Sequence, residues 1–436
     1  MTNLSSVKKL LFDTIHCLES RKLEFIRNPN RDFSRNRKLS LIDTVNLILS
    51  METGSLRNEL HDYFSFSADT VTCSAFIQQR DKIKPALFQS LFYSFTDRLP
   101  DYNRHKYRYF AVDGSDILIP LARNEPQNKP YQYFGRDTQS PYYQMHLNAV
   151  YDLVNERYAA AHIEPRRGHN ERNAIHGMLE EQSFPPNSVF IFDRGYEGYP
   201  LMAHITKKGQ YYIIRAKDYS VGGLVKGLGI PKEGEFDVIY DKILTIRHDS
   251  EAVNDTEHYH RVHCSNSPYF LNKSIREYHL PFRIVRFCLS PGTYECLLTN
   301  LPNDEFDIQA IKKLYGMRWG IETSFRQLKY SVGLVGFHSK KIESIEQEIW
   351  ARLILYNFSM SVKKGIEKRK TKSKFSCKIN VTNAIQVCRR FLKLSPDETP
   401  PNMEWLISRE LIPVRADRKA PRKTTYKYPR KFCYRI

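Results

Sequence analysis

Between Tyr107 and Asp218 the sequence changes its hydrophobic period in an order that few folds satisfy. Three runs rich in aromatic and β-branched residues predict three consecutive strands: "YRYFAVDGSDILIP", "YYQMHLNAVYDL" and "RYAAAHIEP". A helix, a buried strand, a second helix and a further strand follow in "NERNAIHGMLEEQ", "SVFIFD", "YPLMAHITKKG" and "YYIIRAKD". The order β-β-β-α-β-α-β predicts an α/β fold, a mixed sheet with helices on both faces.

Other patterns flank this core. Residues 1–100 space their apolar side chains by three and four and predict an N-terminal helical region. Residues 219–302 carry short strand-like runs and predict a β-rich insertion, after which residues 303–345 return to helix. Residues 346–436 predict a C-terminal helical region that ends in a basic tail. The α/β core is therefore predicted to combine residues 101–218 and 303–345.

The charge of the chain points to a polyanionic partner. Its 67 Lys and Arg residues exceed its 48 Asp and Glu residues, which gives a formal net charge of +19. An excess of that size attracts nucleic acid over long range. A membrane is the competing polyanion, but no run approaches the roughly 18 apolar residues of a spanning helix, and no signal-peptide core is present. We therefore expect a soluble intracellular protein that binds nucleic acid and no membrane.

A short helix in the N-terminal region is a candidate DNA reader. Thr72 or Ser74 can cap a helix in "SADTVTCSAFIQQR". In a helix-turn-helix arrangement that helix would present Gln78, Gln79 and Arg80 to DNA. The preceding loop "RNPNRDFSRNRK" adds arginines that could grip phosphates. Solvated polar residues are the alternative explanation for both segments.

Two aspartates interrupt apolar strands. Asp113 lies within "FAVDGSD" and Asp193 ends "VFIFD", where a charge costs stability unless something compensates it. Sites in α/β sheets gather at the carboxyl ends of strands, so the two carboxylates are predicted to face one crevice. Each also has a structural explanation, because Asp113 could begin a turn with Gly114 and Asp193 could cap the following helix.

The helix predicted for "LYGMRWGIETSFRQLKY" supplies a third carboxylate. At about 100° per residue, with Tyr315 at zero, the same narrow face of the helix holds Arg318 at roughly 300°, Glu322 at roughly 340° and Lys329 at roughly 320°. The apolar stripe of the helix adjoins this face, and Arg318 lies one turn before Glu322, close enough to orient its carboxylate. An ordinary Arg–Glu pair on an amphipathic helix is the alternative.

Three carboxylates without a matching His or Cys cluster favour a hard cation over zinc. Two Mg²⁺ or Mn²⁺ ions held by Asp113, Asp193 and Glu322 would suit phosphoryl transfer on a nucleic-acid backbone. The cationic and phenolic groups on the same helix face would then contact phosphate oxygens.

These residues resemble a known family. The spacing Tyr315, two residues, Arg318, three residues, Glu322, six residues, Lys329 resembles the Y-(2)-R-(3)-E-(6)-K signature of insertion-sequence DDE transposases of the YREK type. The segments "VDGSD" and "FDRGY" resemble the first and second aspartate motifs of that family, in the expected order. The resemblance covers roughly residues 107–341.

The resemblance implies a ribonuclease H-like catalytic core with a β-rich insertion before the helix that carries the glutamate. Asp113, Asp193 and Glu322 would be catalytic and would bind two Mg²⁺ (or Mn²⁺) ions. The chemistry would be hydrolysis at transposon ends and attack of the freed 3′-hydroxyl on target DNA, usually through a hairpin. Phosphates near the cleaved end would be contacted by Tyr315, Arg318 and Lys329. The partners would be double-stranded DNA and a second copy of the chain in a synaptic homodimer, in the bacterial cytoplasm at the nucleoid.

One departure concerns the tryptophan on which some relatives stack a flipped base. The tryptophans of this chain lie outside the insertion, at positions 319, 350 and 405. Tyr240 or Tyr259 could take that role, and Trp319 is expected to pack. Asp116 is a second-choice metal ligand, although strand alternation should point it to the face opposite Asp113.

Two other functions were weighed against strand cleavage. A transposase-derived DNA-binding protein that no longer cleaves would keep the charge and the fold, although the presence of all three acidic residues argues against it. A glycosidase with paired carboxylates fits poorly with the net charge of +19.

Overall fold

The structure is a computed structural model. It describes residues 3–121, 125–133, 142–217, 223–225, 228, 234–263, 269–272, 274–366, 375–394 and 402–414. The basic tail from residue 415 onward therefore lies outside the described residues.

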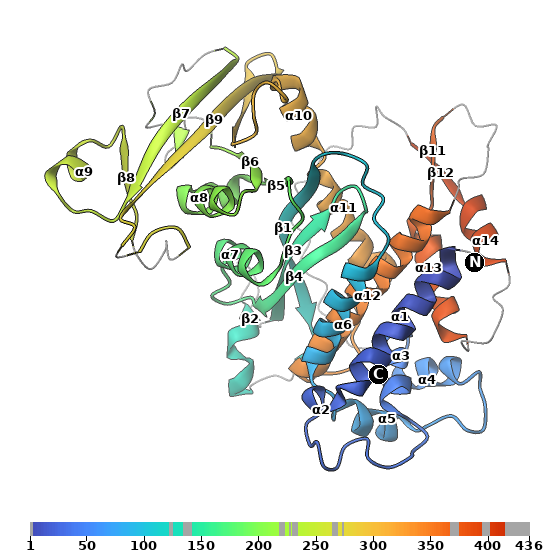
Figure 1. Cartoon of the computed structure of the whole chain (residues 1–436). Helices are drawn as coiled ribbons and strands as arrows, with labels where there is room; N and C mark the ends of the chain where they lie inside the picture. The colour runs from blue at the N-terminus through green and yellow to red at the C-terminus, as the bar shows by residue number, and fades with distance from the viewer. Residues whose placement is uncertain are drawn as a thin grey trace.

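A mixed sheet forms the centre of the molecule (Figure 1). The first five strands of its core are β1 (Arg108–Ile119), β3 (Tyr142–Asp152), β4 (Arg157–Pro165), β5 (Ser188–Phe192) and β6 (Tyr211–Arg215). Strand β3 runs antiparallel to β1 and β4, whereas β5 runs parallel to β1 and β6 parallel to β5. The order across the sheet is β4-β3-β1-β5-β6, which is the order of a ribonuclease H-like core. The predicted fold class is confirmed.

Helices cover both faces of the sheet, because successive side chains of β1 point to opposite faces and both sets are apolar. Phe110 and Val112 pack in a hydrophobic cluster with α7 (Glu171–Glu181) and α8 (Tyr199–Lys207). Ala111 and Ile117 point the other way, into a cluster with α11 (Trp319–Gln327) and α12 (Ile342–Gly365). Odd-numbered and even-numbered residues of β1 therefore face different layers.

The β-rich segment extends this same sheet. It comprises β7 (Phe236–Thr245), α9 (Ser250–Asn254), β8 (Tyr259–Arg261), β9 (Glu277–Ser290) and β10 (Thr293–Thr299). Strand β10 pairs with β6, and β9, β7 and β8 follow outward, while the short β2 (Gln132–Tyr133) pairs with β3 on the other side. These strands and the core strands thus form one sheet of ten strands.

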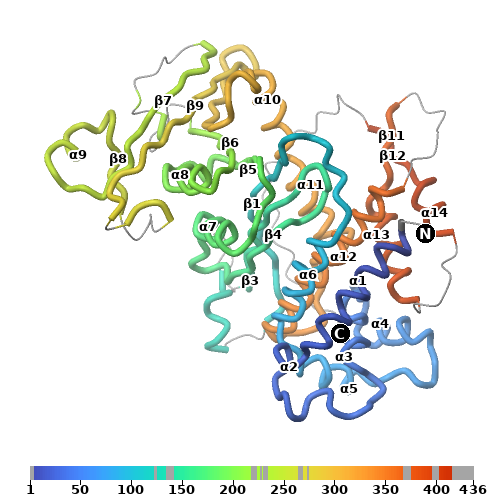
Figure 2. Tube along the Cα trace, viewed as in Figure 1, coloured from blue at the N-terminus to red at the C-terminus, as the bar shows by residue number. Residues whose placement is uncertain are grey.

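The two ends of the chain share a core. The N-terminal helices are α1 (Asn3–Ser20), α2 (Lys22–Phe25), α3 (Leu41–Ser50), α4 (Leu56–Tyr63), α5 (Cys73–Arg80) and α6 (Pro85–Arg98). Helices α1, α3 and α6 pack along α12 (Figure 2). Between Ser344 and Val362 nearly every residue of α12 is buried. Next to α12 lies α13 (Val381–Lys393), which α14 (Met403–Arg409) contacts on another side. Strands β11 (Cys377–Ile379) and β12 (Leu411–Pro413) pair with each other, and β11 contacts α14. The residue boundaries between regions stay a prediction.

Four elements remain: the 3₁₀ turns η1 (Pro126–Tyr131) and η2 (Arg194–Tyr196), the helix α10 (Ile308–Gly316) and the π-helical segment η5 (Leu328–Val332). Among the described helices, none has both the length and the apolarity needed to cross a bilayer.

Candidate active site

The fold brings the three predicted carboxylates to one place. Asp113 lies in β1 on the face that α11 covers, Asp193 follows the last residue of the neighbouring strand β5, and Glu322 lies in the first turn of α11. The guanidinium of Arg318 links two of them. Its Nη1 lies 3.5 Å from Asp113 Oδ2, and its Nη2 donates to Glu322 Oε1 at 2.7 Å.

Asp193 is held from two other sides. The hydroxyl of Tyr315 donates to Asp193 Oδ1 at 3.4 Å. Arg215, at the end of β6, has Nη1 3.9 Å from the same oxygen and Nε 2.9 Å from Glu295 Oε1. The sequence analysis missed Arg215 and Glu295, although an arginine that ends the apolar run "YYIIR" is the same kind of signal that marked Asp193.

The environment of Asp113 favours its neutral form. Burial raises the pKa of this carboxyl to about 6, against the Gly114 N–H and Arg318, which both favour the charged form. The nearby charges of Glu171 and Glu322 push the pKa further upward. A carboxylate in this position is stabilised by any cation that reaches it.

Arg318 is the cation that reaches it in this structure. Its side chain is 5% exposed, and burial works against its charge. Its pKa is nevertheless raised, because Tyr315, Glu322, Asp193 and Asp113 surround it. Arg318 therefore lies between Asp113 and Glu322, and near enough to Asp193 for the two charges to interact.

The helix that carries these residues is interrupted, whereas the predicted angles around it assume one continuous helix. Helix α10 ends at Gly316 and α11 begins at Trp319, with i→i+3 bonds from the N–H of Met317 to Leu314 and of Arg318 to Tyr315. This tightened turn changes the angle between successive side chains. Its result is that Tyr315 contacts Asp193 while Arg318 contacts the other two carboxylates.

Lys329 lies further along, in a π-helical segment, Leu328–Val332. Burial lowers the pKa of its ammonium, and the charge of Asp116 acts in the opposite direction. Among the described residues no ion pair joins Lys329 to the three carboxylates.

The three N-terminal candidates fall in α5, which Thr72 caps through its hydroxyl. Gln78 is exposed, whereas Gln79 is buried. Arg80 is only 2% exposed, and its guanidinium donates to Gln347 Oε1 at 2.8 Å and Glu348 Oε1 at 2.9 Å. Arg80 is therefore buried against α12 and out of reach of a phosphate, and we leave it out of the proposed DNA contacts.

The aromatic candidates are also placed. The hydroxyls of Tyr240 and Tyr259 are bonded within the insertion, to the Leu228 carbonyl and to Glu251. Trp319, which we expected to pack, has 52% of its surface exposed, with the guanidinium of Arg318 5.4 Å from its ring centre. It begins α11 and therefore turns outward beside the carboxylates instead of into the core.

Comparison with known proteins was made on the sequence and on the fold. A family model described as a transposase DDE domain matches residues 104–358, more than half of the chain. No curated protein matches. Among solved structures, seven chains match, including a piggyBac transposase synaptic complex with hairpin DNA. That match has 10% sequence identity and a TM-score of 0.46, and it covers 92% of this chain and 81% of the other.

Proposed function

Since the chain belongs to the family of proteins with a transposase DDE domain, we propose that it is a cut-and-paste DNA transposase. It would bind the terminal inverted repeats of its insertion sequence, cleave the ends and join them to target DNA. The observation that carries this proposal is the meeting of Asp113, Asp193 and Glu322, from three separate elements, around the buried Arg318.

The residues of this site fit divalent cations. All three side chains offer carboxylate oxygens, the ligands that Mg²⁺ and Mn²⁺ prefer. Burial and the neighbouring carboxylates raise the pKa of Asp113, so a cation there would be favoured electrostatically. Two bound ions would activate a water or 3′-hydroxyl and stabilise the leaving oxygen. Asp113, Asp193 and Glu322 would hold them.

The surrounding side chains would position the DNA strand. Arg318 already lies between the carboxylates, so it can exchange one of them for a phosphate oxygen without leaving the site. Tyr315 donates to Asp193 and keeps that carboxylate in place. Lys329 would contact the backbone further from the cleaved bond. The exposed ring of Trp319 offers a flat surface for a base beside the site.

A second DNA contact is proposed on the N-terminal helices. A cavity of about 630 Å³ there has Gln78 and Gln79 in its wall together with several cations. These include Lys22, Arg31, Arg35, Arg37 and Lys82. Burial lowers the pKa of Lys82; Asp32 opposes that change, and the positive charges of Arg37 and Arg31 reinforce it. Crowded positive charge in a concave surface is a site for a phosphate backbone.

The proposed reaction also implies a partner chain and a cellular location. Two transposon ends must be handled together, which calls for a homodimer in the synaptic complex. Both substrates are double-stranded DNA, so the protein would act at the nucleoid in the cytoplasm.

The test is cleavage of the element's own ends. The end sequence is found as inverted repeats in the DNA that flanks the gene. Purified protein should nick a labelled duplex of that sequence with Mg²⁺ or Mn²⁺. Asp113→Asn and Glu322→Gln should abolish nicking, whereas Asp304→Asn, at an exposed aspartate outside the site, should not. Binding to the ends without any nicking would instead establish a catalytically silent DNA-binding protein.

A further inference from the structure

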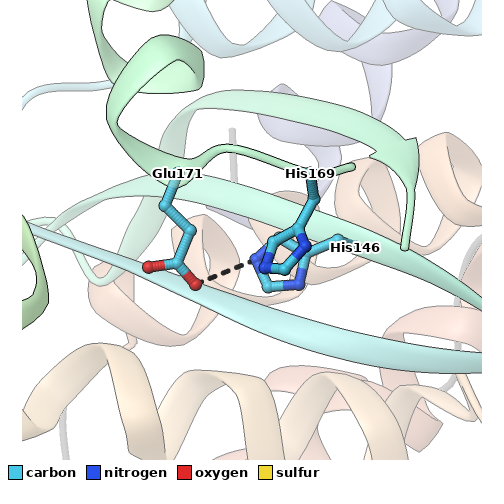
Figure 3. Close-up of side chains that lie close together, drawn as sticks. All are labelled: His146, His169 and Glu171. Atoms are coloured by element: carbon cyan, nitrogen blue, oxygen red, sulfur yellow. Dashed lines mark ion pairs between the residues drawn. The ribbon is translucent and has the colours of Figure 1, made fainter. Parts of the chain in front are cut away.

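A second group of ligand-type side chains lies on the opposite face of β1. It consists of His146 from β3, His169 from the loop before α7, and Glu171, the first residue of α7 (Figure 3). One ligand atom from each lies within 4.8 Å of the other two. Asp116 of β1 pairs directly with His146 across the sheet, on the face away from Asp113. Asp116 was a second-choice ligand in the sequence analysis, and the structure places it in this group.

His146 is the most constrained member. Its side chain is 5% exposed, and its Nδ1 lies 2.7 Å from Asp116 Oδ1. Its Nε2 points toward Glu171 Oε1, 3.1 Å away, but has no hydrogen bond of acceptable geometry among the described residues. A carboxylate on one ring nitrogen fixes the tautomer and directs the other nitrogen at a ligand, which is how metal-binding histidines are usually supported.

The spacing of the three ligand atoms suits a small ion. Tetrahedral ligands at zinc distances are separated by roughly 3.3 Å. The pair formed by His146 Nε2 and Glu171 Oε1 already has about that separation. The rings of His146 and His169 have centroids 4.4 Å apart, so a small movement of His169 completes the set.

Arg166 is the cation that contacts this group directly, while the charge of Lys329 acts on Asp116 from the neighbouring π-helical segment. The Nε of Arg166 lies 2.8 Å from Asp116 Oδ1, and its Nη1 lies 2.5 Å and 2.8 Å from Nδ1 and Nε2 of His169. His169 Nδ1 also lies 2.9 Å from the Arg166 carbonyl oxygen, to which it can donate. An ion bound by His169 Nε2 would displace Arg166 Nη1 from that ring, whereas the contact between Arg166 Nε and Asp116 can remain.

The main chain of β1 also leaves room for these side chains. A Cβ atom at Gly114 would collide with His146 Nε2 and would lie 2.7 Å from Glu171 Oε1. Glycine is therefore the residue that allows two ligand atoms to lie directly against the strand, one position after Asp113.

We propose that His146, His169 and Glu171 bind a transition-metal ion such as Zn²⁺, with Asp116 as the outer partner of His146. Two imidazole nitrogens and one carboxylate form a ligand set that zinc accepts with a fourth position for water, whereas Mg²⁺ prefers oxygen alone. The ion would tie β3, the loop and α7 together behind the strand that carries Asp113. This site uses none of the three carboxylates of the proposed active site.

The experiment measures zinc in the full chain without an affinity tag. Chelator-treated protein is dialysed against Zn²⁺, and bound zinc is measured by mass spectrometry in a Glu322→Gln background, which weakens the other metal site. One equivalent is expected, falling to near zero in Glu171→Gln and His146→Gln. His162→Gln, at an exposed histidine on the adjacent β4, should keep it.

The unfolding temperature is a second measurement, which separates loss of zinc binding from poor folding of a variant. Zn²⁺ should raise the unfolding temperature of the parent chain and of His162→Gln, since a ligand of the folded state stabilises it by mass action. Zn²⁺ should not raise the unfolding temperature of Glu171→Gln. The Glu171 side chain is partly exposed, so this variant should still fold. Equal zinc content in Glu171→Gln and the parent would overturn the proposal, as would no bound zinc in the parent. Neither result depends on whether the protein cleaves DNA.

Discussion

Replacing Arg80 by methionine tests how the N-terminal helices are attached to the rest of the protein. In the structure the Arg80 guanidinium donates to Gln347, Glu348 and the Ser344 carbonyl, all on α12. The Arg80 and Glu348 side chains are 3% and 0% exposed. We expect Arg80→Met to loosen α5 from α12 and to leave Glu348 with too little positive charge around it.

The magnitude follows from this burial. Removing one partner of a buried ion pair costs about 3–5 kcal/mol, because the other charge stays buried. His338 Nδ1 lies 3.2 Å from Glu348 Oε2, and Arg352 Nη2 lies 3.6 Å from it, so part of the charge remains compensated. The free energy of unfolding is therefore expected to fall by about 3 kcal/mol, the lower end of that range.

The assay is urea unfolding followed by circular dichroism, with Arg27→Met as the matched control. Arg27 pairs with Glu343 on the same helix α12, but both side chains are about half exposed. An exposed pair contributes at most about 1 kcal/mol, so Arg27→Met should change the urea midpoint little. The reasoning is refuted if Arg80→Met keeps the parental midpoint while its affinity for DNA ends falls, because Arg80 would then be a DNA contact.

Three further predictions concern the active site and the acid limit of the fold. Glu322→Gln should reduce end cleavage by at least roughly three orders of magnitude in a nicking assay while the gel-shift affinity for DNA ends stays near the parental value, and parallel losses of both would argue for misfolding. Lys329→Ala should weaken binding to different DNA sequences alike and lower the slope of log affinity against log salt by about 1, and an unchanged slope would remove Lys329 from the backbone contacts. Burial disfavours the Glu59 carboxylate, but His338 and nearby backbone N–H groups outweigh it and lower its pKa to about 2. Because this folded-state pKa is lower than the unfolded one, the stabilisation by Glu59 should be present above pH ~4.5 and be lost as the pH falls toward ~2. The free energy of unfolding, measured across that range, should depend less on pH in Glu59→Gln than in the parent chain.

Local patterns predicted the central layer well. The order of strands and helices from residue 107 to residue 218 follows from side-chain periodicity, which each element imposes on its own sequence. Asp113 and Asp193 could be singled out because a charge next to an apolar strand needs compensation. Their actual compensation, by Arg318, Tyr315 and Arg215, comes from other elements of the chain.

The failures of prediction have one kind of cause. Arg80 ends a polar run and looks like a surface residue, but Glu348, far along the chain, makes its burial favourable. The turn between α10 and α11 interrupts a pattern that fits one helix, since the i→i+3 bonds there depend on how both helices pack on the sheet. The group around His146 was missed because no motif or spacing in the sequence links its members, and only the packing of β3 and α7 brings them together.

The sequence by itself determined which elements form in the central layer, and it singled out Asp113, Asp193 and Glu322 as candidate metal ligands. Periodicity and residue type are local properties, and the backbone expresses them wherever the segment lies. Tertiary structure alone decided the partners: which cation lies among Asp113, Asp193 and Glu322, and which face of β1 holds His146. The physical reason is that electrostatic energy depends on distance and burial, and both are set only when distant segments pack together.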